Sequence, residues 1–180
     1  MKEIFKYKPQ VFGHNLGNKE GRVMKKNWKV YAVWIGIAEL VGALSGLLSR
    51  KGMQIYSQTV VQPPLSPPMW VFPVVWSVLY GLMGIGAAMV WLSPESGLRS
   101  KGLNLFIAQL VVNFFWSLIF FNLQAFGFAF IWLLLLLALV VWMSWVFYQV
   151  KPIAGWIQLP YLLWLTFAGY LTVAVWTMNR

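Results

Sequence analysis

Few residues in this sequence could support enzyme or metal chemistry. The 180-residue chain has no cysteine, one histidine and four acidic residues, none of them Asp. The acids are far apart along the chain, which argues against paired-carboxylate catalysis and oxygen-ligated metal sites; they are Glu3, Glu20, Glu39 and Glu95. The absence of cysteine excludes thiolate-ligated metals, and the single His14 excludes a Ser-His-Asp triad. We therefore expect no metal site and no required cofactor.

Glu39 is the one acidic residue inside an apolar stretch, about midway along it. A carboxyl group within a membrane span is costly and is a functional candidate by default. Three interpretations are open: the carboxyl group stays protonated, bonds a neighbouring helix, or faces a wet cavity. Around it, Ala38, Gly42 and Gly46 form a strip of small residues at every fourth position. Such a strip lets another helix approach closely, either within the chain or in a dimer.

Aromatic residues at helical spacing form three candidate faces for ligand binding. Each face places its members at i, at i+3 or i+4, and at i+7; the faces are Trp76, Tyr80 and Met83, then Asn113, Trp116 and Phe120, then Trp164, Ala168 and Leu171. If the faces converge, they line a flat aromatic slot with Gln109 and Asn113 as buried polar groups. A planar macrocycle or a sterol suits such a slot. The alternative is that these aromatic residues serve helix packing or interfacial belts.

Five apolar stretches are long enough to position these faces as membrane-spanning helices. Hydrophobic residues make up 60% of the chain and charged residues 10%, which excludes an ordinary water-soluble surface. A span needs about 20 apolar helical residues, and we predict spans at about 30–49, 68–92, 103–122, 126–149 and 153–177. The predicted fold class is an all-α membrane protein, a five-transmembrane-helix bundle formed by residues 29–180.

The residues before the first span differ from the rest. Residues 1–28 are polar and basic, and we predict a disordered N-terminal tail there. Two hypotheses address residues 1–23: they are a disordered extension, or the start site is placed too early. Because Met24-Lys25-Lys26 directly precedes a span, it resembles a natural start.

The basic residues near the membrane are distributed unevenly between its two sides. On the N-terminal side they are Lys19, Arg22, Lys25, Lys26, Lys29, Arg99, Lys101 and Lys151, and on the other side Arg50, Lys51 and Arg180. This asymmetry predicts a multi-pass protein with its N-terminus in the cytoplasm and its C-terminus outside. Membrane anchoring also accounts for the net charge of +10 without nucleic-acid binding. The expected partner is therefore the lipid bilayer.

A proline-rich segment precedes the second stretch. Its prolines stiffen the backbone; they are Pro63, Pro64, Pro67 and Pro68. We interpret this segment as a lid over a cavity, and the alternative is a rigid helix entry with Ser66 as the cap. Pro73 and Pro160 are expected to kink the second and fifth helices near Trp76 and Trp164, and so to help open a pocket.

A family resemblance begins at residues 63–84, which read PPLSPPMWVFPVVWSVLYGLMG. This stretch resembles the signature of the translocator protein family, also called the peripheral benzodiazepine receptor or tryptophan-rich sensory protein family. Asn113, Trp116 and Phe120 resemble its third-helix motif. The stretches YQV at 148–150 and LPYLLWLTFA at 159–168 resemble the end of its fourth helix and the start of its fifth, and Asn179 also fits. The resemblance covers about residues 30–179, across all five spans.

The resemblance implies a bacterial member of this family in the cytoplasmic membrane. Such members are five-helix bundles, usually homodimers, whose pocket near the first loop binds porphyrins. Some are associated with light- and oxygen-dependent breakdown of protoporphyrin IX, and Trp76 and Trp164 match the tryptophan pair tied to that chemistry. The resemblance also assigns further positions to the pocket; they are Asn113, Trp116, Phe128, Ala168 and Leu171.

Several positions depart from the family pattern. Leu65 and Phe128 stand where many members have Trp, which bears on the selectivity of the pocket. The sterol-recognition pattern of the fifth helix needs a Tyr and then a basic residue, and Val173 and Thr177 stand there instead. This argues against sterol binding of the animal kind. The third helix lacks the small residues used for dimerisation and carries bulky ones, so a dimer would use another face; the bulky residues are Ile107, Val111 and Val112.

Three functions are compatible with these features. The first is a tetrapyrrole-binding receptor or sensor, with photo-oxidative degradation of its ligand. The second is a carrier of porphyrins or other lipophilic metabolites, and the third is a non-catalytic membrane module that acts through a partner protein. The scarcity of acid–base groups disfavours hydrolytic and transferase chemistry. The absence of paired charges within the spans weakens ion-coupled transport.

Overall fold

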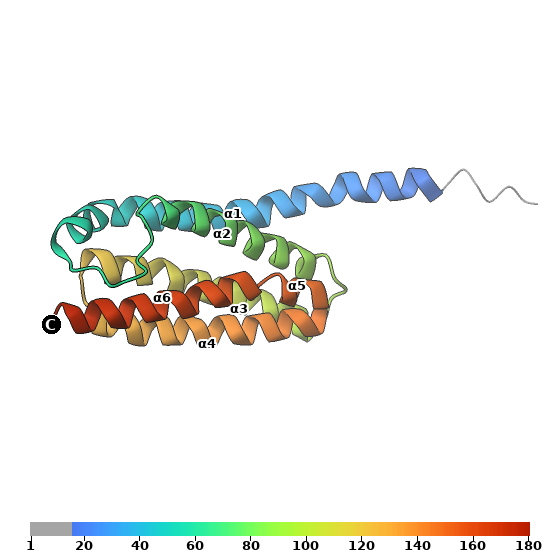
Figure 1. The fold of residues 1–180 in the computed structure, drawn as a ribbon. Helices are drawn as coiled ribbons and strands as arrows, with labels where there is room; N and C mark the ends of the chain where they lie inside the picture. The colour runs from blue at the N-terminus through green and yellow to red at the C-terminus, as the bar shows by residue number, and fades with distance from the viewer. Residues whose placement is uncertain (1–15) are drawn as a thin grey trace, which may run out of the picture.

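The structure, a computed structural model, describes residues 16–180, with side chains from Asn27 onward. The described chain contains helices and turns and no strand; its elements are α1 (Leu16–Thr59), α2 (Val71–Trp91), α3 (Gly97–Ser117), the π-helical segment η1 (Leu118–Asn122), α4 (Phe126–Val150), α5 (Pro152–Trp156) and α6 (Leu159–Met178). The long helices run roughly parallel or antiparallel to one another (Figure 1). The N-terminal part of α1 extends beyond one end of the bundle, and the C-terminus lies at the other.

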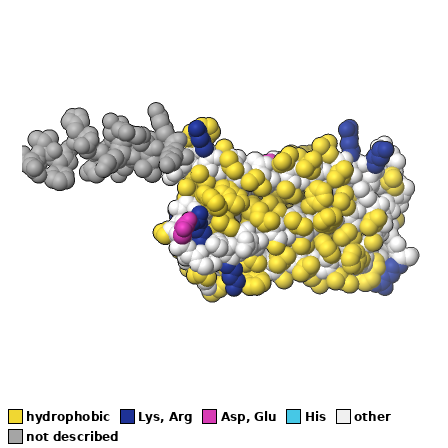
Figure 2. Space-filling model, turned by 180° about the vertical axis from the view of Figure 1, so that it is seen from behind, with side chains coloured by type: hydrophobic (Ala, Val, Ile, Leu, Met, Phe, Trp, Pro, Cys, Tyr) yellow, Lys and Arg dark blue, Asp and Glu magenta, His cyan; other side chains and the backbone are white. Residues whose placement is uncertain are grey.

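Within residues 16–180, five helical segments are long and apolar enough to cross a bilayer. They are Asn27–Thr59, Val71–Trp91, Gly97–Asn122, Phe126–Val150 and Pro152–Met178. On the face shown in Figure 2, hydrophobic side chains cover the middle of the molecule, and Lys and Arg gather at its two ends. This pattern is typical of a protein surrounded by lipid with basic residues at the headgroups. The predicted all-α fold with five membrane-spanning helices is confirmed, and the chain is a multi-pass membrane protein.

Helix α1 is longer at both ends than the predicted span at 30–49. It continues through Arg50, Lys51 and Gly52 to Thr59. Gly52 lies within the helix and allows a close contact with η1, since a Cβ there would collide with backbone atoms of Phe121. Residues 16–28, expected to belong to a disordered tail, form the first turns of α1. The rest of the predicted tail, residues 1–15, lies outside the described residues, as does the greater part of 1–23 that the start-site hypothesis concerns.

Pro73 and Pro160 lie near the starts of helices and not within them, as the predicted spans had placed them. Pro73 is the third residue of α2, and Pro160 is the second residue of α6. At these positions the missing N–H group has no partner within the helix in any case, so neither proline removes a hydrogen bond from its own helix. The fifth span is instead interrupted at residues 157–158, between α5 and α6. Ser66 does not cap α2, because α2 begins only at Val71 and the Ser66 N–H donates to the Pro63 carbonyl, 3.2 Å away, within the loop.

Close contacts and indole hydrogen bonds join the helices in pairs. Helix α2 places Gly84 against the backbone of Ile35 in α1, where a Cβ would collide. Helices α3 and α4 form a hairpin in which Trp132 Nε1 donates to the Val112 carbonyl at 2.8 Å. Small residues and hydrogen bonds are what hold helices together in lipid, where apolar burial between helices gains little.

The C-terminal half of α1 leaves α2 and packs on α3 and η1. Ser45 Oγ donates to the Phe114 carbonyl at 3.0 Å, and Asn122 Nδ2 donates to the Leu48 carbonyl at 3.0 Å. Ser49 and Ser117 are also hydrogen-bonded, at 3.2 Å. Helix α1 therefore contacts α2 between Ile35 and Gly42, and it contacts the α3–η1 segment from Ser45 onward. The space between these contacts is the candidate site.

Candidate functional site

A cavity of about 720 Å³ lies among α1, α2, α3 with η1, and α6. Its volume is in the range of about 300–1,000 Å³ that is typical of small-molecule sites. The three predicted aromatic faces meet here, since most of their members line the cavity. The predicted site residues in its walls are Glu39, Trp76, Tyr80, Asn113, Trp116, Trp164, Ala168 and Leu171. Convergence of these faces is what the slot interpretation required.

Two predicted ligand-binding residues do not line the cavity. Met83 is fully buried in the helix core, and its Sδ accepts a hydrogen bond from Gln109 Nε2 at 3.5 Å. The contact of Gly84 with α1 closes the space between α1 and α2 at this level. Phe128 has 52% of its surface exposed and packs on Trp132 of the same helix, because α4 contributes no residue to the cavity wall.

A chain of buried hydrogen bonds holds the polar side of the cavity. The Tyr80 hydroxyl donates to Asn113 Oδ1 at 2.8 Å, and Asn113 Nδ2 donates to the Tyr161 hydroxyl at 2.7 Å. The Tyr161 hydroxyl in turn donates to Gln109 Oε1 at 3.0 Å. Of the two polar residues predicted in the slot, Asn113 lines the cavity, whereas Gln109 lies behind the cavity wall. The sequence analysis missed Tyr161, although a Tyr within a span needs a partner for its hydroxyl group.

Trp116 is fixed in position by two contacts. Its Nε1 donates to the Ala129 carbonyl of α4 at 3.2 Å, and its ring stacks on Phe120 with 5.1 Å between centroids. Phe120 belongs to η1, where the wider π-helical turn changes the direction of the side chains, as such turns often do at functional sites. Tyr56 of α1 packs on the Phe120 ring with 5.4 Å between centroids, and Tyr56 also lines the cavity. Tyr56 was not predicted, because the first span was expected to end before it.

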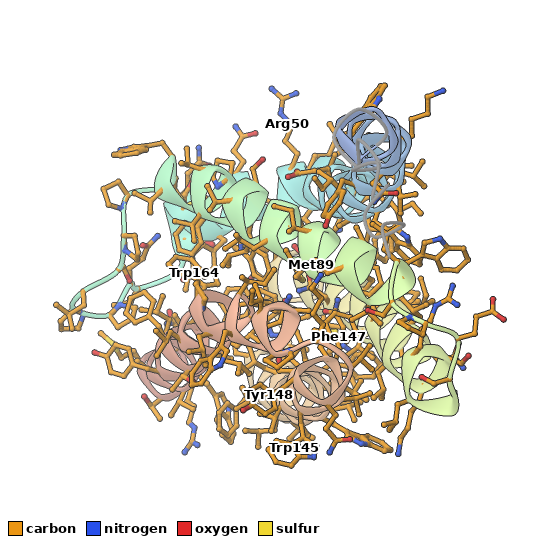
Figure 3. The ribbon with its side chains drawn as sticks, turned by 90° about the vertical axis from the view of Figure 1, so that its right-hand side faces the viewer. Arg50, Met89, Trp145, Phe147, Tyr148 and Trp164 are labelled. Atoms are coloured by element: carbon orange, nitrogen blue, oxygen red, sulfur yellow. The ribbon has the colours of Figure 1, made fainter. Side chains whose placement is uncertain are left out.

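Trp76 and Trp164 are both half-buried and line the cavity from α2 and α6. Trp76 packs on Tyr80 and on the edge of Tyr161, with centroid distances of 5.5 and 6.1 Å. Trp164 packs on Phe72 at 6.0 Å, which links α6 to α2. Figure 3 shows Trp164 between the ribbons of these two helices. Each indole therefore has one side against protein and another toward the cavity.

The proline-rich loop lies at the end of the bundle where the cavity begins (Figure 1). None of its prolines lines the cavity; these are Pro63, Pro64, Pro67 and Pro68. The loop is instead attached to α6, because the Asn179 side chain binds both backbone groups of Val61 and the Tyr170 hydroxyl donates to the Pro64 carbonyl at 3.3 Å. Met69 and Phe72, which follow the loop, do reach the cavity.

Glu39 is half-buried and lines the cavity, together with Ser77 of α2. The Ser77 hydroxyl lies 3.3 and 3.2 Å from the two carboxylate oxygens. Of the interpretations open from sequence, the bond to a neighbouring helix and the cavity-facing position both hold. Arg50 also borders the cavity, but its side chain projects away from the bundle (Figure 3). In the small-residue strip, the Tyr80 ring packs directly against Gly42, and both Gly42 and Gly46 border the cavity.

Comparison with known proteins agrees with this architecture. The family model described as TspO/MBR family matches residues 34–177. The translocator protein of Bos taurus is 36% identical over 152 residues, which cover 78% of this chain and 87% of that protein. The tryptophan-rich protein TspO of Chlorobaculum tepidum is 32% identical over 160 residues (87% and 99%). The tryptophan-rich sensory protein of Cereibacter sphaeroides is 29% identical over 156 residues (87% and 95%). Five membrane-spanning helices, four of which line an aromatic cavity, together with this match show that the chain belongs to the TspO/MBR family.

Proposed function

We propose that this protein is a membrane receptor or sensor that binds porphyrins such as protoporphyrin IX, or similarly flat lipophilic molecules, in the cavity described above. The observation that carries the proposal is the convergence of Trp76, Trp116 and Trp164 on one cavity of about 720 Å³. Aromatic rings favour offset stacking and edge contacts with a planar guest. No further cofactor is needed for this function, because the porphyrin is itself the ligand.

The shape of the cavity supports a binding site reached from one side. Its lining runs along α1 from Glu39 to Tyr56, which is about 26 Å of helix at 1.5 Å per residue. It therefore reaches from the loop end to about the middle of the first span. At the level of Gly84 the contact between α1 and α2 closes it. A ligand can be held in this space without passing through the protein.

Photo-oxidative degradation of the bound porphyrin is the finer part of the proposal. An illuminated porphyrin generates reactive oxygen, and an adjacent indole is an oxidisable electron donor. Trp76 and Trp164 line the cavity from two different helices, so either indole can lie beside a bound ring. This chemistry requires no acid–base residue, which fits the composition of the chain.

Transport of tetrapyrroles or other lipophilic metabolites is the alternative that the name of the Bos taurus relative favours. It would require the α1–α2 contact at Gly84 to open, since this contact closes the cavity. A non-catalytic module acting through a partner protein would have no need of an internal cavity of this size. A homodimer remains an expectation for this protein.

The proposed location is the bacterial cytoplasmic membrane, with the N-terminus in the cytoplasm and the C-terminus outside. Arg99 and Lys101 lie at the start of α3, and Lys151 joins α4 to α5, at the same end of the bundle as the projecting part of α1 (Figure 1). Lys51 and Arg180 lie toward the opposite end. The excess of basic residues at the N-terminal end supports this orientation.

Titration of the purified protein with protoporphyrin IX tests the binding proposal. We expect saturable quenching of tryptophan fluorescence at micromolar ligand, because three indoles line the cavity. Ala168→Phe places a ring in the cavity and should abolish saturable quenching. Ala138→Phe, on the exposed side of α4, is the matched control and should bind protoporphyrin IX with the affinity of the parent protein. Quenching that does not saturate, or that survives Ala168→Phe unchanged, would contradict binding in this cavity.

A further inference from the structure

We infer that Glu39 and Ser77 form a subsite that accepts the protonated amine of a lipophilic ligand. This ligand class differs from the porphyrins proposed above, whose charged groups are carboxylates. The inference rests on the proposed function only in that it uses the same cavity. It assigns a role to the single acidic side chain within the membrane spans.

The Glu39 carboxylate lies over one face of α2. Its two oxygens lie 3.3 and 3.2 Å from Ser77 Oγ. A Cβ added at Gly81, one helical turn after Ser77, would lie 3.8 Å from Glu39 Oε1. The carboxylate therefore occupies the gap between α1 and α2 beside two small residues. Both Glu39 and Ser77 line the cavity, so the gap is continuous with it.

The hydrogen-bonding capacity of this carboxylate is largely unused. An ionised carboxylate can accept about four hydrogen bonds, and Ser77 supplies one hydrogen. Among residues 27–180, the one salt bridge joins Arg99 to Glu95, so no basic side chain of these residues forms a salt bridge with Glu39. Arg50, the other charged residue at the cavity, projects away from the bundle. A charge in this environment is costly until it is paired, so a cationic guest is stabilised here.

A protonated amine suits the geometry better than other cations. Its N–H groups donate to the free carboxylate positions, and charge-assisted bonds of this type are strong. The neighbouring rings of Trp76 and Tyr80 add cation–π attraction. A divalent metal ion would need several oxygen ligands, and Glu39 is the one carboxylate in the cavity lining. The apolar remainder of the cavity would hold a flat or elongated hydrocarbon body.

A pair of matched fluorescent probes tests the inference. The full chain is reconstituted in nanodiscs of uncharged phosphatidylcholine and titrated with 1-pyrenemethylamine, which is protonated at neutral pH, or with the neutral 1-pyrenemethanol. Energy transfer from tryptophan to pyrene reports binding. We expect the amine to bind about tenfold more tightly than the alcohol, because one charge-assisted hydrogen bond increases affinity by about this factor.

Two carboxyl-to-amide variants separate the subsite from general electrostatics. Glu39→Gln should remove the preference for the amine and leave the affinity for the alcohol unchanged. Glu95→Gln makes the same charge change at a side chain that is 94% exposed outside the cavity, and it should keep the preference. Glu39→Asp shortens the side chain and should retain a reduced preference. This third variant gives a readout if Glu39→Gln fails to fold.

Three results would overturn the inference. They are equal affinity of the parent protein for the two probes, a preference that survives Glu39→Gln, and a preference that Glu95→Gln also removes. Binding of the alcohol without preference for the amine would overturn the subsite alone and leave the cavity proposal standing. Saturable quenching by protoporphyrin IX without binding of either probe would likewise overturn the subsite alone. Failure of all three ligands would overturn both proposals.

Discussion

Asn179, next to the C-terminus, binds both backbone polar groups of Val61 at the start of the proline-rich loop. The Val61 N–H donates to Asn179 Oδ1 at 2.9 Å, and Asn179 Nδ2 donates to the Val61 carbonyl at 2.9 Å. The same Nδ2 also donates to the Val175 carbonyl near the end of α6. One side chain therefore joins the loop to α6. The loop beside this end of the cavity is therefore attached to the last helix.

Removing this attachment should speed ligand release. Asn179→Ala eliminates two hydrogen bonds to the loop, each contributing about 1 kcal/mol. We expect the dissociation rate of protoporphyrin IX to rise by about tenfold, with a small change in the association rate, as measured by stopped-flow fluorescence. Thr177→Ala removes only a local bond to the Ala174 carbonyl and is the control. An unchanged dissociation rate would show that the loop does not retain the ligand.

Asn113 should contribute more to stability than any other side chain of the cavity wall. It joins Tyr80 of α2 to Tyr161 of α6. Asn113→Ala leaves two buried hydroxyl groups short of a partner, and we expect the free energy of unfolding in detergent to fall by about 1–3 kcal/mol. In combination with Tyr161→Phe, the loss should be smaller than the sum of the single losses, because both variants break the same bond. Additive losses would show that the two side chains are not coupled.

Gly42 should control the position of Tyr80, and with it the width of the cavity. A Cβ at Gly42 would overlap the Tyr80 ring, whereas nothing lies within 4 Å of the corresponding position at Gly36. Gly42→Ala should displace the ring and weaken protoporphyrin IX binding by about tenfold, measured by tryptophan quenching. Gly36→Ala should leave binding unchanged and raise helix stability by up to about 1 kcal/mol. Equal affinities in the two variants would contradict this role for Gly42.

The proposed photochemistry predicts a separation of binding from degradation. Trp76→Phe and Trp164→Phe keep an aromatic ring in the cavity but remove the oxidisable indole. Protoporphyrin IX should still bind, while its light-driven loss in air slows on the order of tenfold or more in the double variant. Trp145→Phe, on the outer face of α4 (Figure 3), is the control and should degrade the ligand at the parent rate. Loss of porphyrin at the parent rate in the double variant would exclude both indoles as electron donors.

The natural absence of cysteine makes the orientation testable with single introduced thiols. Gln58→Cys lies near the end of α1, and Gly97→Cys lies at the start of α3 at the opposite end of the bundle. A membrane-impermeant maleimide should label the first in intact cells and the second only after permeabilisation. The reverse pattern would invert the proposed topology.

The sequence by itself determined the number of spans and most members of the three helix faces that line the cavity. Apolar length fixes how many helices cross the bilayer, and the helical period fixes which residues share a face. Trp76 and Tyr80 could therefore be grouped, as could Trp164, Ala168 and Leu171, and all of them line the cavity. Glu39 could be identified because a carboxyl group in an apolar stretch stands out.

Only the tertiary structure decided where the faces stop and what the polar groups bind. Periodicity says nothing about how far a face extends before a neighbouring helix covers it. The contact of Gly84 with α1 buries Met83, and the placement of α4 behind the cavity leaves Phe128 outside. Pro73 and Pro160 stand in the first turns of α2 and α6, because the starts of these helices are set by loop geometry that composition does not encode. Hydrogen bonds between residues far apart in the chain, such as Asn113 to Tyr161 or Asn179 to Val61, depend on the rotation of each helix, which the packing of the whole bundle fixes.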